Sequence, residues 1–297
     1  MKTSLTASAI LALASHVLGH GYVWRITADN TVYPGWDVYI DPYMSPKPAR
    51  IAFGGGGVNP IFNVDGPELA CNVRPTAPGA IAEVRAGSTI TFHWSRWLYS
   101  HKGPITAWLA PYEGDVAGVN VNKLEFFKIA EDTVDEAGVW ANVRMMDETN
   151  MTWTATIPAD VKAGTYVLRH ELMALHFAVS TTPGFEWSPI GPQFYMACFN
   201  FKVTGDGTAT PKGVTFPGGY SLEKDPGLTF NLSSDAAFTP IGPALHKSEK
   251  TVELKPKELV VISPTGNETT DATYYTTQEQ VLVAQAAMTE YFDSIGG

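Results

Sequence analysis

The sequence predicts an all-β fold, an antiparallel β-sandwich, from two observations. First, the 3.6-residue periodicity of amphipathic helices is scarce along the chain. Second, short runs rich in β-branched and aromatic residues recur at 88–94, 153–157 and 198–203, with clusters of Gly, Pro and Asn between them. Runs of this length bounded by turn residues are typical of sandwich strands.

The chain begins with a predicted signal peptide at residues 1–19. Lys2 gives it a basic start, and residues 5–14 form an apolar run that is too short to cross a bilayer. Two cleavage sites fit the small-residue rule, one before Ser15 and one before His20. The cleavage rules do not decide between these two sites. Cleavage before His20 would make a histidine the first residue of the mature protein.

Three further segments complete the predicted organisation. A long loop at about 33–78 carries prolines and the glycines 54–57, and loops of this length usually carry function or form a surface. Residues 163–176 predict a turn that leads into a long central strand. We expect one domain over 20–245, followed by a partly disordered tail at 246–297 with a short helix at 277–291.

The charge balance excludes two kinds of partner. The formal net charge is −10 at pH 7, so neither nucleic acid nor an anionic membrane is expected to bind. Aromatic residues make up 11% of the chain. Because Trp and Tyr rings stack on the C–H faces of sugars, a neutral polysaccharide is compatible with this composition.

Cys71 and Cys198 predict one long-range disulfide, because a leader directs the chain to an oxidising compartment. Two buried free thiols are the alternative. Three N-x-S/T sequons, at Asn150, Asn231 and Asn267, are candidate glycosylation sites that fit secretion from a eukaryotic cell.

Residues able to bind a metal occur in three separate segments. With cleavage before His20, its α-amine and imidazole can chelate a metal together, since a terminal amine with a pKa near ~7.7–8.0 loses its proton easily. His101 would add a second imidazole, and three nitrogens in one plane favour Cu(II). Tyr195 could supply an axial oxygen. Gln193, on the same face of a strand as Tyr195, and His176 could bond a ligand held by the metal.

Each of these residues also has a plain structural explanation. His101 would be a surface loop residue, and Tyr195 would be a core residue beside a cysteine. The His-Glu pair at 170–171 resembles the start of the zinc-protease helix motif, but that motif needs a second histidine where Ala174 stands. No G-x-S-x-G motif occurs, which argues against a serine hydrolase.

Taken in order, these segments resemble the fungal lytic polysaccharide monooxygenases of auxiliary activity family 9. The matching pieces are His-Gly at 20–21, Asp-Pro-Tyr-Met-Ser at 41–45, Cys71, Ser-His-Lys-Gly-Pro at 100–104, the run 168–176, Gly-Pro-Gln-Phe-Tyr at 191–195, Cys198, Phe-Pro-Gly-Gly-Tyr at 216–220 and Asp-Pro-Gly at 225–227. The resemblance covers most of residues 20 to about 232. Its order and combination are specific, and they favour cleavage before His20.

The resemblance implies an immunoglobulin/fibronectin-like antiparallel β-sandwich with long loops and a flat copper-bearing face, in a catalytic domain at 20–245. It implies one copper ion per chain, held by His20 and His101 with Tyr195 in the axial position. His176 and Gln193 would orient and protonate the oxygen co-substrate. The terminal histidine of such fungal enzymes is often Nτ-methylated.

The activity implied is that of a secreted monooxygenase. It would take electrons from an external donor, a small reductant or a redox enzyme, and use O2 or H2O2 to oxidise C1 or C4 of a β-1,4-glucan in cellulose or a related hemicellulose. We expect the protein to act as a monomer. Tyr220 matches a tyrosine that many members display on the flat face, and Tyr43 and Trp36 are further candidates for stacking on the polysaccharide.

The chain also departs from the family. Residues 177–192, which contain Phe185 and Trp187, look like an insertion that could reshape the copper face. A second disulfide found in many members is absent, and the tail has no counterpart. Two other functions therefore stand as alternatives: a secreted non-catalytic protein that binds copper or wall polysaccharide, and a structural β-sandwich without a metal, which cleavage before Ser15 would favour.

Overall fold

The structure is a computed structural model that describes residues 20–180 and 188–263. Ten strands are found in this part of the chain: β1 (Val23–Ala28), β2 (Thr31–Pro34), β3 (Ala82–Arg85), β4 (Thr89–Trp94), β5 (Ile105–Tyr112), β6 (Phe127–Asp132), β7 (Thr152–Thr156), β8 (Gly164–Ala174), β9 (Gln193–Thr204) and β10 (Val260–Val261). The helical segments described are short: α2 (Glu68–Cys71), α3 (Ala141–Asp147), η1 (Asp41–Tyr43), η2 (Val116–Gly118), η3 (Val121–Lys123) and η4 (Pro226–Thr229).

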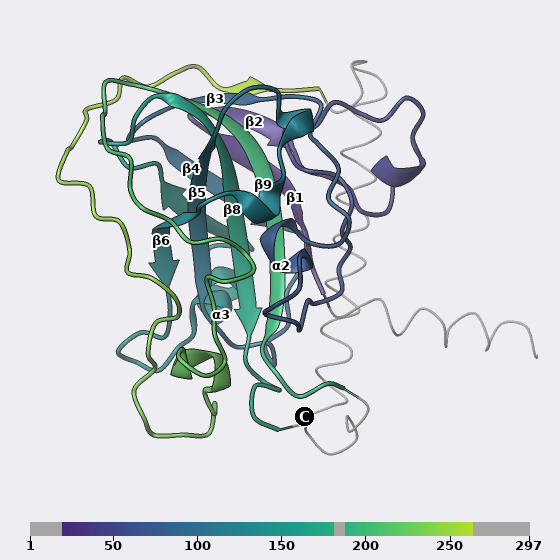
Figure 1. The fold of residues 1–297 in the computed structure, drawn as a ribbon, viewed down its shortest axis with the longest axis vertical. Coiled ribbons are helices and arrows are strands. Elements are labelled where there is room, and N and C mark those ends of the chain that lie inside the picture. The colour runs from purple at the N-terminus through teal and green to yellow at the C-terminus, as the bar shows by residue number, and fades with distance from the viewer. Residues whose placement is uncertain (1–19, 181–187, 264–297) are drawn as a thin grey trace, which may run out of the picture.

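The strands form two five-stranded sheets that pack face to face (Figure 1). The first sheet has the order β10-β2-β1-β4-β7, and the second has the order β3-β9-β8-β5-β6. Neighbouring strands are antiparallel except in the pairs β10–β2 and β3–β9. The predicted sandwich is therefore confirmed, with two parallel pairs at the sheet edges.

The two central strands of the second sheet, β8 and β9, are buried on both faces. Leu168 and Phe199 belong to the core between the sheets, whereas Val167 and Phe194 belong to a second cluster on the outer face, under the long loops. Because both faces are covered, these strands lack the polar alternation of a half-exposed strand.

The register of β8 and β9 fixes which residues meet at each end of the sandwich. Ala174 pairs with Gln193 at one end, and Gly164 pairs with Val203 at the other. Residues that follow β8 therefore lie beside residues that begin β9.

The predicted disulfide between Cys71 and Cys198 is confirmed, with a Cα–Cα distance of 5.4 Å, so the free-thiol alternative is excluded. It joins α2 to β9. The Arg169 guanidinium of β8 reinforces this junction, because its Nε donates to the carbonyl oxygen of Ala70 at 3.0 Å. The short helix is thus fixed to the outer face of the second sheet.

The loop predicted at about 33–78 is ordered around a buried ion pair. Arg50 donates from Nε and Nη2 to the Asp41 carboxylate at 2.8 and 2.9 Å, and both side chains are almost fully buried. Such a paired charge resists disruption, because removing one partner leaves the other buried and uncompensated. The pair fixes η1, which carries Tyr43 at its end.

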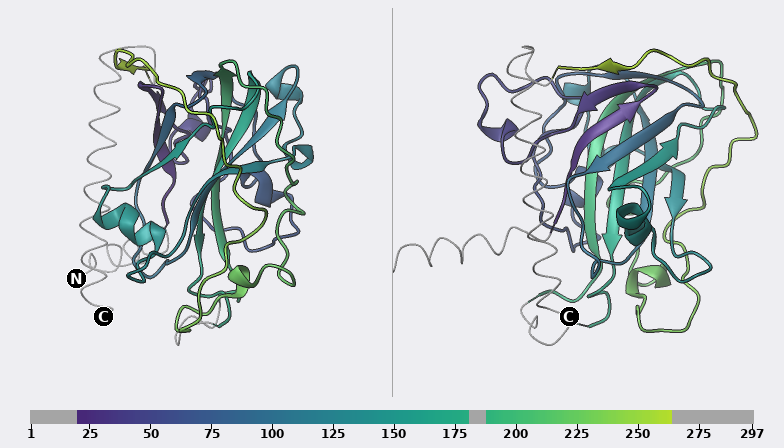
Figure 2. Two further views of the ribbon diagram at one scale, coloured as in Figure 1. Left: turned by 90° about the vertical axis from the view of Figure 1, so that its left-hand side faces the viewer. Right: turned by 180° about the vertical axis from the view of Figure 1, so that it is seen from behind.

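The first part of the predicted tail, residues 246–263, packs along the sandwich. They run over one end of the molecule and add β10 to the first sheet (Figures 1 and 2). The signal peptide, Phe185, Trp187, Asn267 and the helix predicted at 277–291 lie outside the described residues. Asn150 and Asn231 lie on exposed loops. No helix within residues 20–180 and 188–263 has the length and apolar character needed to cross a membrane.

Candidate metal centre

The end of the sandwich where β8 finishes and β9 starts gathers residues from four segments. Nε2 of His20, ahead of β1, lies 3.1 Å from Nε2 of His101, in the turn before β5. The Tyr195 ring of β9 has its centroid 5.1 Å from that of His20. The His176 ring, two residues beyond β8, lies 4.1 Å from that of His101. The four residues predicted to surround a metal are therefore neighbours.

Local packing explains the glycine that follows His20. A Cβ atom on Gly21 would come within 2.0 Å of the carbonyl oxygen of Arg96, so no other residue fits without displacing the backbone. The next residue, Tyr22, forms two hydrogen bonds with Ser95. Its amide donates to Ser95 Oγ at 3.1 Å, and its carbonyl accepts from the Ser95 amide at 2.9 Å. These contacts hold the start of β1 against the end of β4, so that His20 reaches the end face.

Three residues hold the turn that carries His101. Trp97 Nε1 donates to the His101 carbonyl at 3.0 Å, and the buried amide of Asn142 donates to the same oxygen. Asn142 Oδ1 also accepts from the Gly103 amide at 3.1 Å. A Cβ on Gly103 would come within 2.1 Å of the Met173 carbonyl, so this glycine lets the turn lie against β8.

The environment keeps both facing imidazoles neutral. Burial, followed by the nearby Arg96 cation, lowers the pKa of His20 to about 4. Burial also holds the pKa of His101 well below its ordinary value, with smaller effects from His176, His20 and Arg96. Since a metal binds the neutral imidazole, both rings are in the form needed for coordination near neutral pH.

Tyr195 is nearly buried, and its hydroxyl donates to Gln193 Oε1 at 2.6 Å. The two side chains share a face of β9, as their spacing predicts. The Trp97 ring meets the Tyr195 ring edge-on, with centroids 4.8 Å apart. Burial raises the pKa of Tyr195 well above its ordinary value, so the phenol remains protonated.

His176 stands beside this group with one unsatisfied atom. Burial, followed by the effect of His20, lowers its pKa to about 4. Its Nδ1 is buried and has no hydrogen-bond partner among the described residues. A buried polar atom without a partner costs free energy, so an additional polar group at this end would be stabilising.

The donor set fits a copper ion. Two neutral imidazole nitrogens face each other, a phenol lies beside one of them, and an unpaired ring nitrogen lies next to the other. Among residues 20–180 and 188–263, no three His, Cys, Asp or Glu side chains form a metal-binding group. A third nitrogen would come from the His20 α-amine, which cleavage after Gly19 frees. Nitrogen donors of this kind suit Cu(II).

The structure contradicts the prediction that Tyr220 stacks on substrate. Its side chain is 3% exposed, and its ring stacks on Phe194 with centroids 5.7 Å apart. Its hydroxyl donates to the buried Glu171 carboxylate at 2.6 Å. The segment after β9 folds back over the second sheet and carries Tyr220 into the outer core, where it satisfies a carboxylate.

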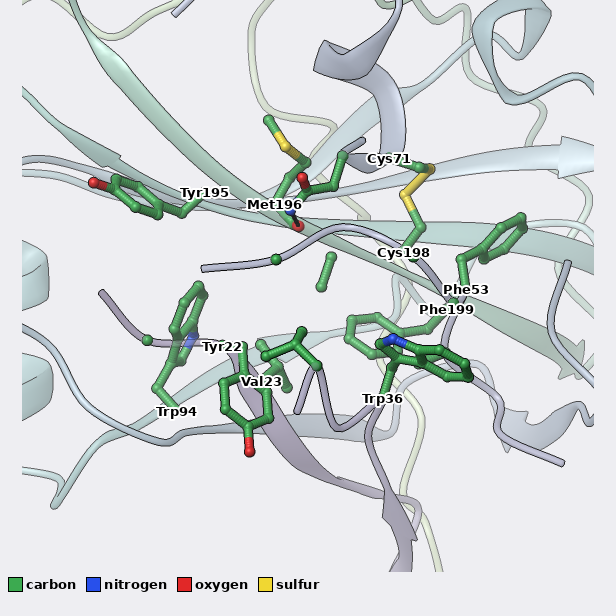
Figure 3. A pocket seen from close by; sticks show the side chains of 18 residues that line it. Tyr22, Val23, Trp36, Phe53, Cys71, Trp94, Tyr195, Met196, Cys198 and Phe199 are labelled. Atoms are coloured by element: carbon green, nitrogen blue, oxygen red, sulfur yellow. Dashed lines mark hydrogen bonds between the residues drawn. A yellow bond between two sulfur atoms is a disulfide. The ribbon is translucent and has the colours of Figure 1, made fainter. Parts of the chain in front are cut away.

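Trp36 is the second of the three residues predicted to stack on the polysaccharide. It is partly buried, and its ring lies against Gly54. With Tyr22, Trp94 and Tyr195 it lines a partly open pocket of about 50 Å³ next to the candidate metal centre (Figure 3). Tyr43, in contrast, is 85% exposed at the end of η1.

Two exposed tyrosines near the metal-binding end were not predicted from the sequence. Tyr39 is 41% exposed, and its ring contacts that of Tyr22, two residues after His20, with centroids 5.9 Å apart. Tyr99 is 48% exposed, precedes His101 by two residues and donates its hydroxyl to Asp147. The closeness of Tyr99 to His101 in the sequence could have indicated it; no local pattern marks Tyr39.

His170 has a structural role. Its ring is fully buried and stacks on both Phe92 and Trp153, with centroid distances of 3.9 and 5.2 Å. Its Nε2 accepts from Trp94 Nε1 at 2.9 Å. The His-Glu pair at 170–171 is therefore part of the sandwich interior, in agreement with the sequence-based argument against a zinc protease.

Fold and site together define a β-sandwich protein with a candidate metal centre at the end of its sheets. The family model for Auxiliary Activity family 9 (formerly GH61) matches residues 20–239. The AA9 family lytic polysaccharide monooxygenase A of Geotrichum candidum is 38% identical over 250 residues, which cover 83% of each chain. The chain therefore belongs to Auxiliary Activity family 9, and it is an oxidoreductase, a lytic polysaccharide monooxygenase.

Solved structures agree with this assignment. The extended catalytic domain of H. jecorina LPMO9A superposes with a TM-score of 0.71 and 29% identity, covering 82% of this chain and 99% of that one. A cellulose-active polysaccharide monooxygenase from M. thermophila superposes with a TM-score of 0.65 and 29% identity, covering 77% of this chain and 99% of that one. The immunoglobulin-like description of the sandwich agrees with these neighbours.

Proposed function

We propose that this chain is secreted, loses its leader before His20, and acts as a copper-dependent monooxygenase that cleaves β-1,4-glucan at C1, C4 or both. One observation carries the proposal: the Nε2 atoms of His20 and His101 face each other at 3.1 Å at the end of the sandwich. Both belong to rings kept neutral by burial. Two neutral imidazole nitrogens held this close can coordinate the same metal ion.

Copper would be held by His20, through its α-amine and imidazole, by His101 and by the phenol oxygen of Tyr195. Bound copper supplies one-electron redox chemistry toward O2 or H2O2, which an external reductant starts. The protein supplies a fixed geometry. Asn142, Trp97 and Gly103 hold the His101 turn through backbone contacts, and such outer partners commonly tune metal affinity.

Three side chains beside the metal are suited to handle oxygen and protons. Gln193 Oε1 accepts a hydrogen bond from the Tyr195 hydroxyl, with the two oxygens 2.6 Å apart, so the phenol is held in one orientation. The Gln193 amide nitrogen is left as a donor for the co-substrate. His176 has an unpaired Nδ1 among the described residues and lies 4.1 Å from the His101 ring, so its neutral imidazole is suited to hydrogen-bond a reduced oxygen species.

The substrate is proposed to be a neutral glucan, cellulose or a related hemicellulose. Tyr39 and Tyr99 lie beside the metal-binding end with 41% and 48% of their surface exposed, and Tyr43 lies further out with 85% exposed. Tyrosine rings can stack on glucose rings while their hydroxyls contact sugar hydroxyls. The net charge of −10 imposes no penalty on an uncharged chain. The cellulose activity of the M. thermophila relative supports this choice of substrate.

The test is product analysis. Mature protein loaded with one equivalent of copper is incubated with cellulose, xyloglucan or other β-glucans, with and without ascorbate. The proposal predicts oxidised oligosaccharides that require both copper and reductant, and whose C1 or C4 oxidation is read by mass spectrometry. Copper binding without any oxidised product would instead support a non-catalytic copper- or polysaccharide-binding protein.

A further inference from the structure

Residues 246–263, here named the strap, connect the two sheets at the end of the sandwich opposite the candidate metal centre. The strap leaves the edge of the second sheet at β6, crosses this end and joins the edge of the first sheet at β2 (Figures 1 and 2). The register identifies the end: Asp29 and Asn30 form the turn between β1 and β2, away from the Val23–Trp94 pair next to His20.

The first anchor of the strap lies on the second sheet and the loop before β8. The His246 amide donates to the Lys128 carbonyl of β6 at 2.8 Å, and its Nε2 lies 3.0 Å from Asp160 Oδ1. Its ring meets Phe127 edge-on, with centroids 5.8 Å apart. Lys250 then pairs with Asp206, which follows β9. That last pair is exposed and contributes little by itself.

The second anchor lies where the β1–β2 turn of the first sheet meets Arg85 of β3 in the second sheet, and its body carboxylate is less exposed. Lys257 pairs with Asp29, a carboxylate that is 4% exposed and that Arg85 also contacts, at 2.6 Å. Arg85 Nη1 donates to the Lys255 carbonyl at 2.9 Å. Beyond this pair the Val260 amide donates to Asn30 at 3.1 Å, so that β10 lies parallel to β2.

The charges of these anchors are divided between the two sides. The strap contributes the cationic or protonatable partners His246, Lys250 and Lys257, and the body contributes the carboxylates Asp160, Asp206 and Asp29. A segment held this way by ion pairs and a two-residue strand is bound weakly along its middle. Ionic strength should therefore weaken its attachment.

We propose that the strap is a salt-sensitive clamp: docked, it joins the two sheets at the end away from the metal centre, and its release opens that end without disturbing the metal centre. Between its anchors the strap forms one wall of an open pocket of about 350 Å³, and Gly87, Ile129 and Ala159 of the body line the opposite side. Release would expose this apolar lining and remove a connection between the sheets. The inference is independent of copper and of the substrate.

Limited proteolysis of the full mature chain tests the clamp. Trypsin can cut after Lys250 and Lys257, whereas Pro256 protects Lys255. Val260→Pro and Ile262→Pro each remove an amide that donates to the first sheet, to Asn30 and Val32. Val261→Pro is the matched control, because alternate residues donate in a parallel ladder and its amide points away from β2.

The clamp predicts that Val260→Pro and Ile262→Pro increase cleavage after Lys257 by about tenfold or more, while Val261→Pro stays within about twofold of the parent, because proteolysis follows the population of the open form. In the parent, 1 M NaCl should accelerate the same cleavage relative to 0.05 M, after correction for trypsin activity on a small peptide. Equal cleavage in all three variants, or no response to salt in the parent, would overturn it.

Discussion

The Nε2 atoms of His20 and His101 lie 3.1 Å apart although 81 residues separate them in the chain. We predict that His101→Ala weakens Cu(II) binding by the mature protein by more than about 100-fold, because loss of a direct ligand should exceed the ~10–100-fold effect of an outer partner. Isothermal titration calorimetry measures the affinity. His93→Ala is the matched control, since His93 bonds to Arg25 and Thr27 instead of the metal site. Equal affinities for the two variants would contradict the ligand assignment.

Asn142 should matter for copper even though it does not reach the metal. Its amide fixes the His101 carbonyl and the Gly103 amide, so Asn142→Ala releases the turn that carries the ligand. We expect copper affinity to fall by about 10–100-fold. Asn200→Ala, which removes an equally buried amide bonded to Tyr112, should lower the melting temperature but leave copper affinity unchanged. If both variants lose stability and neither loses affinity, Asn142 has only a structural role.

Tyr195→Phe removes the hydroxyl proposed to contact copper and its hydrogen bond to Gln193. We expect the variant to retain copper within about tenfold, because the nitrogen ligands remain, and to change its electron paramagnetic resonance spectrum. Tyr166→Phe removes a comparable hydroxyl bonded to the Lys162 carbonyl, and its spectrum should match that of the parent. Identical spectra for all three proteins would place the phenol away from the metal.

Substitutions of exposed and buried tyrosines should have opposite effects on cellulose binding and on stability. Tyr220→Phe removes one of the donors to the buried Glu171 carboxylate, so it should lower the free energy of unfolding by about 1–3 kcal/mol. It should leave binding to cellulose unchanged. Tyr39→Ala and Tyr99→Ala should do the reverse, weakening cellulose binding with little loss of stability. A pull-down on cellulose measures binding, and a denaturant titration measures stability. Weaker cellulose binding by Tyr220→Phe would show that Tyr220 contacts the substrate after all.

The Asp29 carboxylate gives a prediction about pH. Burial alone would raise its pKa, but hydrogen bonds and charge from Arg85 and Lys257 hold the pKa below its ordinary value. A carboxylate with a lowered pKa in the folded state stabilises above about pH 3.8, and this contribution is lost as pH falls through the folded value. The stability difference between the parent and Asp29→Asn should therefore be full at pH 6 and shrink below about pH 4. A difference that stays constant down to pH 2 would argue against the ion pair.

The sequence predicts those features that local patterns encode. Short β-prone runs between turn residues predict the sandwich, and two cysteines in a chain with a predicted leader predict the disulfide. The spacing of Gln193 and Tyr195 places both on one face of a strand. The convergence of His20 with His101 follows only from family resemblance, because short motifs do not specify contacts 81 residues apart.

Other features depend on tertiary packing that no local pattern carries. Tyr220 is buried because its segment folds back over the second sheet. Asn142 bonds to the backbone of residues that lie 41 and 39 positions away in the chain, so no local sequence motif marks it. The strap has a polar composition that predicts disorder, yet ion pairs and a two-residue strand hold it to the body.

We propose that His20 becomes the first residue and supplies both its amine and its ring to copper. Mass spectrometry of the secreted protein, with sequencing of its N-terminal peptide, identifies that residue. We expect a chain that starts at His20, with its ring unmodified or methylated. A mature chain that starts at Ser15, or at any other residue, would keep the His20 amine in a peptide bond and would contradict the proposed metal centre.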